Sequence, residues 1–155
     1  MFFTALIFGA LAGSLALIIE IVVLNASGSL TTASSGADFT NLAIVALAVL
    51  IEEITRLLFL RQFFKRFLAT VTPTWPALYF IGLCYGLGYA TLELGLIVGQ
   101  GATAFFGLAG IVLVHTALSV LFAFSLSRVL PFALPLTFGL AVILHFLYNL
   151  SLILS

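Results

Sequence analysis

The sequence predicts an all-α membrane protein with about five transmembrane helices, and composition is the first reason. Hydrophobic residues make up 64% of the 155 residues and charged residues only 6%, with a mean hydropathy of +1.38. Soluble domains carry about 25% charged residues, so an ordinary soluble globule is excluded. The apolar runs are also long and continuous, whereas a transmembrane β-barrel would need short alternating segments.

The first two helices are expected at 2–24 and 41–60, since a bilayer core needs about 20 apolar residues per helix. The first segment is interpreted as a retained span because it lacks the basic start of a signal peptide and its apolar run is too long. The stretch at 25–40 is rich in Gly, Ser and Thr, which predicts a loop. The basic sequence RQFFKRF follows the second helix.

Proline and glycine mark the boundaries of the remaining helices, which are expected at 76–98, 103–127 and 132–155. Pro73 and Pro76 flank Trp75, a pattern typical of a helix start with an aromatic residue at the membrane interface. The sequence GQGA predicts a tight turn before the fourth helix. The five helices form one transmembrane helical domain that covers residues 1–155.

The positions of the basic residues predict the orientation of the helices. Under a five-helix count, the second-to-third and fourth-to-fifth connections face the same side, and both are basic through Arg61, Lys65, Arg66 and Arg128. The positive-inside rule makes that side cytoplasmic. The N-terminus is then cytoplasmic, while the Ser/Thr-rich loop and the C-terminus lie outside.

Composition and residue spacing indicate which partners the chain is expected to have and which are excluded. Five Lys+Arg against five Asp+Glu leave no basic surface for nucleic acid, and a single cysteine excludes a disulfide framework. The lipid bilayer is the expected environment. Glycine pairs at four-residue spacing indicate close helix packing. The favoured interpretation is packing within the chain, and the alternative is a homodimer or larger membrane complex. The pairs are Gly9 and Gly13, Gly82 and Gly86, and Gly95 and Gly99.

Ionisable residues inside the predicted helices are the main functional signal, because such residues are costly in a membrane and usually mark function. At about 1.5 Å rise per residue, four of them lie roughly 15–18 Å below the outer ends of their helices. They are Glu52, Glu53, His115 and His145. This depth is near the bilayer midplane, so we expect one polar site there. Glu93 is shallower, and Glu20 is expected at the interface.

Spacing within each helix supports a single site. Arg56 can pair with Glu53 or Glu52 at three or four residues' distance, which would hold one carboxylate as an ion while the other faces a cavity. His145 and Asn149 are four residues apart and share a helix face. Glu93 shares a face with Tyr89.

Two kinds of chemistry fit these residues. A carboxylate beside a histidine can act as a general base on water, and His and Asn side chains can donate hydrogen bonds to an oxyanion. Two histidines and a glutamate are also a ligand set for catalytic zinc, with His115, His145 and Glu93 as candidates. The cofactor prediction therefore stays open between Zn²⁺ and none. The sequence has no HExxH or GxSxG motif.

Four ordered motifs resemble a superfamily of intramembrane proteases that includes the CAAX-prenyl proteases, the bacteriocin-processing (CPBP) proteins, PrsW and YhfC. The anterior-pharynx-defective subunit of γ-secretase is a non-catalytic relative. The motifs are EEITR, GLGYATLE, VHTA and HFLYN, which contain Glu52, Glu53 and Arg56; Glu93; His115; and His145 and Asn149. The arginine comes one residue earlier than in CAAX-type members, so the pattern is closer to PrsW and YhfC.

The resemblance implies an intramembrane endopeptidase that cleaves a membrane protein or peptide, in a prokaryotic plasma membrane. Glu52 or Glu53 would activate water, and His115, His145 and Asn149 would bind or polarise the scissile carbonyl. Arg56 and Glu93 would support them. Two alternatives remain: a non-catalytic scaffold or subunit with a structural Glu/His core, and a small proton-coupled transporter.

Overall fold

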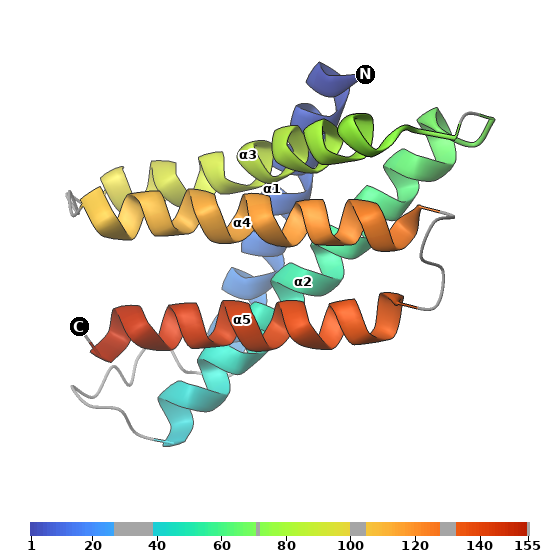
Figure 1. Ribbon diagram of the computed structural model, residues 1–155. Coiled ribbons are helices and arrows are strands. Elements are labelled where there is room, and N and C mark those ends of the chain that lie inside the picture. The colour runs from blue at the N-terminus through green and yellow to red at the C-terminus, as the bar shows by residue number, and fades with distance from the viewer. Residues whose placement is uncertain (27–38, 71, 100–104, 128–132, 155) are drawn as a thin grey trace.

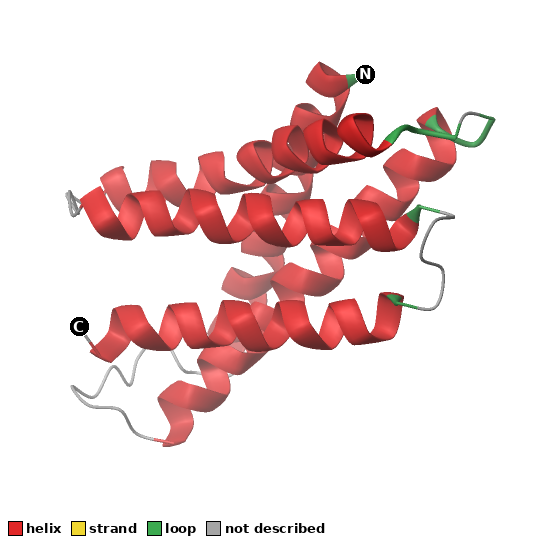
Figure 2. Ribbon diagram, viewed as in Figure 1, coloured by secondary structure: helices red, strands yellow, loops and turns green. Residues whose placement is uncertain are grey.

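The computed structural model describes residues 1–26, 39–70, 72–99, 105–127 and 133–154. These residues form five helices: α1 (Phe2–Ala26), α2 (Phe39–Phe67), α3 (Trp75–Gly99), α4 (Phe105–Leu126) and α5 (Leu134–Leu154). The described ranges contain no strand, as Figure 2 shows. The prediction of an all-α protein is confirmed.

Four of the five helices, α1, α3, α4 and α5, are long and apolar enough to cross a membrane. Their length and composition are those of an integral membrane protein. The exception is α2, whose middle carries Glu52, Glu53 and Arg56. The helix α2 therefore differs from the other four helices in carrying the charged residues that the sequence predicts at a polar site.

The helix α2 is longer than the segment predicted from hydropathy, because the basic sequence RQFFKRF continues the helix instead of ending it. This extension is amphipathic: Phe63 is fully buried, while Arg61 and Lys65 are exposed. The ring of Phe63 meets Phe8 of α1 edge to face at 5.6 Å. Basic residues in the last turn also interact favourably with the helix dipole. Hydropathy predicts the end of the helix at the first charged residues, whereas the helix continues to Phe67 because its aromatic residues pack on α1.

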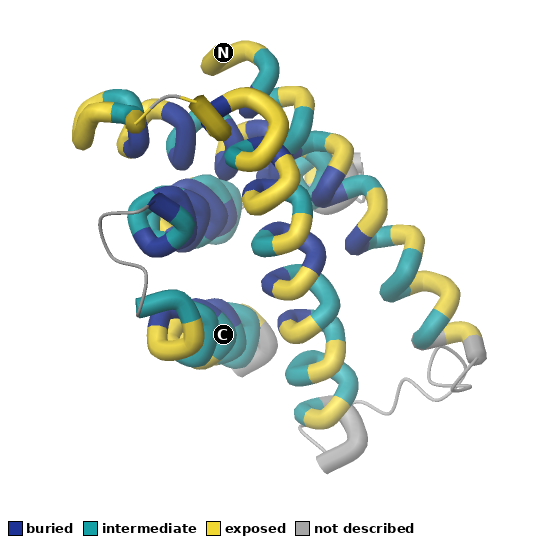
Figure 3. The backbone as a smooth tube through the Cα atoms, turned by 90° about the vertical axis from the view of Figure 1, so that its right-hand side faces the viewer, coloured by how far each residue is buried: buried dark blue, intermediate teal, exposed yellow. Residues whose placement is uncertain are grey.

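The helices α3, α4 and α5 lie side by side with α4 in the middle, and α1 and α2 cross them obliquely (Figure 1). The helix α1 packs on α3 and α2, and α2 also packs on α5 and α4. The end of α2 and the start of α3 lie at the same end of the bundle as the end of α4 and the start of α5. Buried positions line the inner faces of the helices, and exposed positions face outward (Figure 3).

Glycine allows α3 to touch its two neighbours backbone to backbone. A Cβ added to Gly9 of α1 would lie 1.9 Å from the carbonyl oxygen of Tyr85, and one added to Gly86 of α3 would lie 2.6 Å from that of His115. Any larger residue would force these helices apart. Gly95, by contrast, has open space around it. The pairs in α1 and in the first half of α3 thus serve packing within the chain.

Candidate active site

Six ionisable side chains from four helices converge in the interior of the bundle. Glu52, Glu53 and Arg56 come from α2, Glu93 from α3, His115 from α4 and His145 from α5. Glu53 and Arg56 are fully buried, and both histidines are 1% exposed. The two imidazole rings lie nearly perpendicular, with centroids 5.1 Å apart. The residues that the sequence predicts at one depth thus form one contiguous cluster.

Glu53 is the carboxylate that pairs with arginine. Its Oε1 accepts a hydrogen bond from Nη1 of Arg56 at 2.5 Å, the three-residue alternative of the two expected. The same oxygen lies 2.6 Å from Nδ1 of His145. An arginine remains protonated in proteins, so Glu53 and Arg56 form a buried ion pair, and Glu53 accepts the Nδ1–H of His145.

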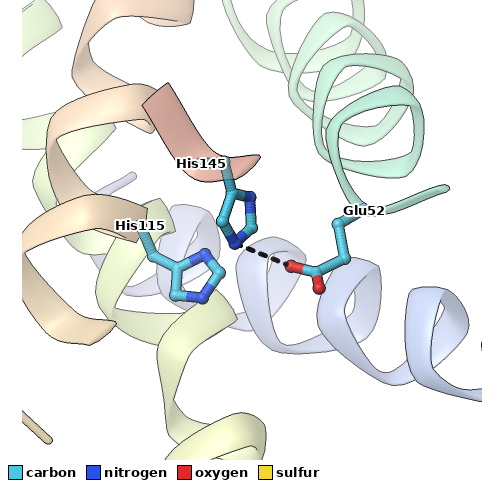
Figure 4. A group of neighbouring side chains, drawn as sticks. All are labelled: Glu52, His115 and His145. Atoms are coloured by element: carbon cyan, nitrogen blue, oxygen red, sulfur yellow. Dashed lines mark ion pairs between the residues drawn. The ribbon is translucent and has the colours of Figure 1, made fainter. Parts of the chain in front are cut away.

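This contact fixes which nitrogen of His145 is free. A neutral imidazole has one N–H donor and one acceptor nitrogen, so a proton on Nδ1 leaves Nε2 as the acceptor. Nε2 of His145 faces Oε2 of Glu52 at 3.6 Å (Figure 4). That Glu52 oxygen is buried and has no hydrogen-bond partner among the described residues. With Glu52 ionised, as a general base must be, two acceptors face each other, an arrangement that one molecule donating to both would stabilise.

His115 is held in the opposite way. Its Nδ1 contacts Nη2 of Arg56, and its Nε2 contacts Oε2 of Glu93. Arginine can only donate hydrogen bonds, so Nδ1 of His115 accepts and Nε2–H donates to the Glu93 carboxylate. Both ring nitrogens of His115 are thus engaged. The two histidines carry their protons on different nitrogens, because Arg56 faces one and Glu53 faces the other.

Two tyrosines of α3 also belong to the site. The hydroxyl of Tyr85 donates to the backbone carbonyl of Arg56 at 3.0 Å, and that of Tyr89 donates to the carbonyl of Glu52 at 3.2 Å. The sequence predicts for Tyr89 only a helix face shared with Glu93, and it gives no prediction for Tyr85. A signal was present: the tyrosines are four residues apart, the same spacing as the two α2 residues whose carbonyls they contact.

Two further polar residues lie near the cluster. Asn149 is half-buried one turn after His145, and its side chain forms no hydrogen bond with any described residue. Glu20 of α1, expected at the interface, has a buried Oε1 without a partner in the described part of the chain. Its charge interacts with those of Glu93 and Glu52.

The geometry also allows a test of the zinc hypothesis. The donor atoms of Glu52, His115 and His145 lie within 4.8 Å of one another (Figure 4). Glu52 replaces the expected Glu93, because Glu93 bonds to His115. Zinc holds nitrogen ligands at about 2.0–2.1 Å, and a metal ligand needs a free lone pair. His115 offers none, since Arg56 occupies Nδ1 and the proton on Nε2 faces Glu93. In this arrangement the three residues do not fit a zinc ion.

Comparison of the chain with protein-family models, curated proteins and solved structures finds no match.

Proposed function

We propose that this protein is a membrane-embedded endopeptidase in which Glu52 activates a water molecule. One observation carries the proposal: the Glu52 carboxylate has a buried, unpartnered oxygen that faces the free Nε2 of His145, in the described part of the chain. The neighbouring Glu53 is neutralised by Arg56 and orients the ring of His145. Two adjacent carboxylates thus have different environments, as a base and its supporting ion pair require.

The 3.6 Å separation is longer than a direct hydrogen bond, and both atoms can contact one water molecule at normal hydrogen-bond length. Such a water donates one hydrogen to Glu52 and the other to His145. Its oxygen attacks the scissile carbonyl carbon while Glu52 takes a proton. The intermediate then collapses, the carbon–nitrogen bond breaks, and Glu52 returns that proton to the leaving amine. The half-buried carboxamide of Asn149 supplies an N–H donor for the oxyanion.

The remaining residues do not contact the water molecule and instead hold His145 in position. Glu53 holds the Nδ1–H of His145, Arg56 holds Glu53, and His115 with Glu93 holds the second arm of Arg56. We therefore assign His115 a supporting role instead of the carbonyl-binding role that the resemblance implies. The order of the four motifs, similar to that of the PrsW and YhfC proteins, supports proteolysis and a prokaryotic plasma membrane.

The test compares new protein N-termini in membranes that contain wild-type protein or the Glu52→Gln variant at equal expression. Glutamine keeps the shape of glutamate but cannot take a proton, so we expect cleavage products with wild type only. The matched control is Arg61→Gln, an exposed change in the same helix. Identical N-terminal profiles for wild type and a folded Glu52→Gln protein would refute the proposal.

A non-catalytic scaffold is the second candidate, and one observation favours it. A continuous chain of contacts links Glu53, Arg56, His115 and Glu93 across three helices, as a structural core would require. The two functions differ in what Glu52→Gln does. A scaffold loses helix packing or partner binding, whereas a protease loses cleavage and keeps its fold.

A further inference from the structure

Tyr89 contacts three parts of the site at once. Its hydroxyl donates to the backbone carbonyl of Glu52 at 3.2 Å. The guanidinium carbon of Arg56 lies 4.5 Å from the centre of its ring. The ring of His115 lies 5.1 Å away, centroid to centroid. Tyr89 itself is only 3% exposed. One buried side chain thus contacts the backbone of Glu52, the guanidinium of Arg56 and the ring of His115.

The ring face bears directly on how Arg56 is oriented. Arg56 uses Nη1 for Glu53 and Nη2 for His115, but its buried Nε has no hydrogen-bond partner among the described residues. No hydrogen bond at Nε therefore fixes the plane of the guanidinium, and the group lies over the aromatic ring of Tyr89. The attraction between a cation and an aromatic ring is stronger when both are removed from water. The orientation of the guanidinium plane in turn decides whether Nη1 reaches Glu53 and Nη2 reaches His115.

The position of Tyr89 is fixed from two sides. A Cβ added to Gly13 of α1 would lie 2.9 Å from the carbonyl oxygen of Tyr89, and Gly9 packs in the same way on Tyr85. On the other side, Gly86 packs on the backbone of His115. The backbone of α3 that carries Tyr89 therefore cannot shift without moving α1 or α4. This packing fixes the point on α3 from which the ring reaches Arg56.

We infer that Tyr89 is a positioning residue, which holds the Arg56 guanidinium in the plane that sets His115 and His145 in opposite tautomers. His115 carries its proton on Nε2 and His145 on Nδ1. The inference deepens the proposed function, because Arg56 also holds Glu53, and the proton that Glu53 keeps on Nδ1 of His145 leaves Nε2 of that ring free to face Glu52. Its primary test, however, needs neither a substrate nor cleavage.

The test uses ¹⁵N-histidine-labelled protein in lipid nanodiscs. The chain has two histidines, so NMR can resolve the protonated and bare nitrogen of each ring, and His115→Gln assigns the signals. Wild type should show one ring protonated on Nε2 and the other on Nδ1. Tyr89→Met removes the ring face, and His115 should then populate both tautomers. Tyr89→Phe keeps the face and should keep the wild-type pattern, as should Tyr79→Phe, the matched control at an exposed position of the same helix.

Two results would overturn the inference. One is a wild-type protein whose histidines share one tautomer, and the other is a folded Tyr89→Met variant with the wild-type pattern. If Tyr89→Met does not fold, Arg56→Lys replaces it, since lysine keeps the charge but lacks the planar fork. It must then produce the same mixture of tautomers at His115, and an unmixed pattern contradicts the inference.

The kinetic test uses a quenched fluorescent peptide that spans a cleavage site found by the comparison of N-termini. Misplaced catalytic groups can cost about 100-fold in rate, so Tyr89→Met should lower kcat by about that factor and leave KM nearly unchanged. Tyr89→Phe should stay close to wild type. The two proposals can fail separately. Opposite tautomers without any proteolysis would refute the protease, and proteolysis with a shared tautomer would refute the role of Tyr89.

Discussion

Removing the positive charge of Arg56 is expected to destabilise the protein strongly. In Arg56→Met the methionine keeps an unbranched apolar stem in the fully buried position but leaves the Glu53 carboxylate without its ion-pair partner. Breaking a buried pair by removing one partner costs about 3–5 kcal/mol. Nδ1 of His115 also loses its donor, and an unsatisfied buried acceptor costs about 1–3 kcal/mol. Because the two effects share one side chain they do not add fully, and we expect a loss of about 4 kcal/mol.

The assay is reversible unfolding in mixed micelles, in which increasing SDS is followed by circular dichroism. The double variant Glu53→Gln/Arg56→Met removes both charges and should be more stable than Arg56→Met alone, because no unpaired charge is left in the interior. Arg61→Met, in the exposed part of the same helix, should leave the midpoint unchanged. If Arg56→Met costs less than about 1 kcal/mol, the value of an exposed ion pair, then Glu53 and Arg56 are not buried together and the argument for the site fails.

Three further predictions concern packing, catalysis and metal. Gly9→Ala should lower the free energy of unfolding by about 1–3 kcal/mol, because the added Cβ would meet the Tyr85 carbonyl oxygen at 1.9 Å. Gly95→Ala, which has open space around it, should leave that free energy unchanged. Equal effects of the two variants in the micelle assay would contradict this packing. Asn149→Ala should lower kcat for the fluorescent peptide about 100-fold with KM unchanged, and an unchanged kcat would remove Asn149 from the mechanism. Treatment with 1,10-phenanthroline should leave proteolysis intact, and a loss restored by Zn²⁺ would show that His115 exchanges its partners for a metal.

Composition and the length of the apolar runs are sufficient to predict the helices, and they also indicate which polar residues meet. Continuous apolar runs determine the helices, and a common depth places Glu52 and the histidines in one layer. Rotation about a helix axis is harder to predict. Arg56 projects between Glu52 and Glu53, so the sequence leaves the choice of partner open. His145 of α5 decides it by placing Nδ1 against Glu53, at a distance of 92 residues along the chain.

Tautomers are harder still to predict, because they depend on what each ring nitrogen faces. The partner of Nδ1 is an arginine for His115 and a glutamate for His145, and both partners come from α2. The same applies to Tyr89, whose role depends on a guanidinium from another helix. Its own neighbours in the sequence are apolar or small, and a tyrosine in that setting indicates packing.

The pairing of Glu53 with Arg56 also bears on how the protein is made. Both residues are in α2, which leaves the ribosome long before α5 carries His145 to the site. A lone carboxylate or guanidinium would oppose insertion of α2 into the bilayer. Because the two are three residues apart, each can neutralise the other as soon as the helix forms. Glu53 and Arg56 thus enter the membrane as a locally neutral pair, before any other helix of the site is present.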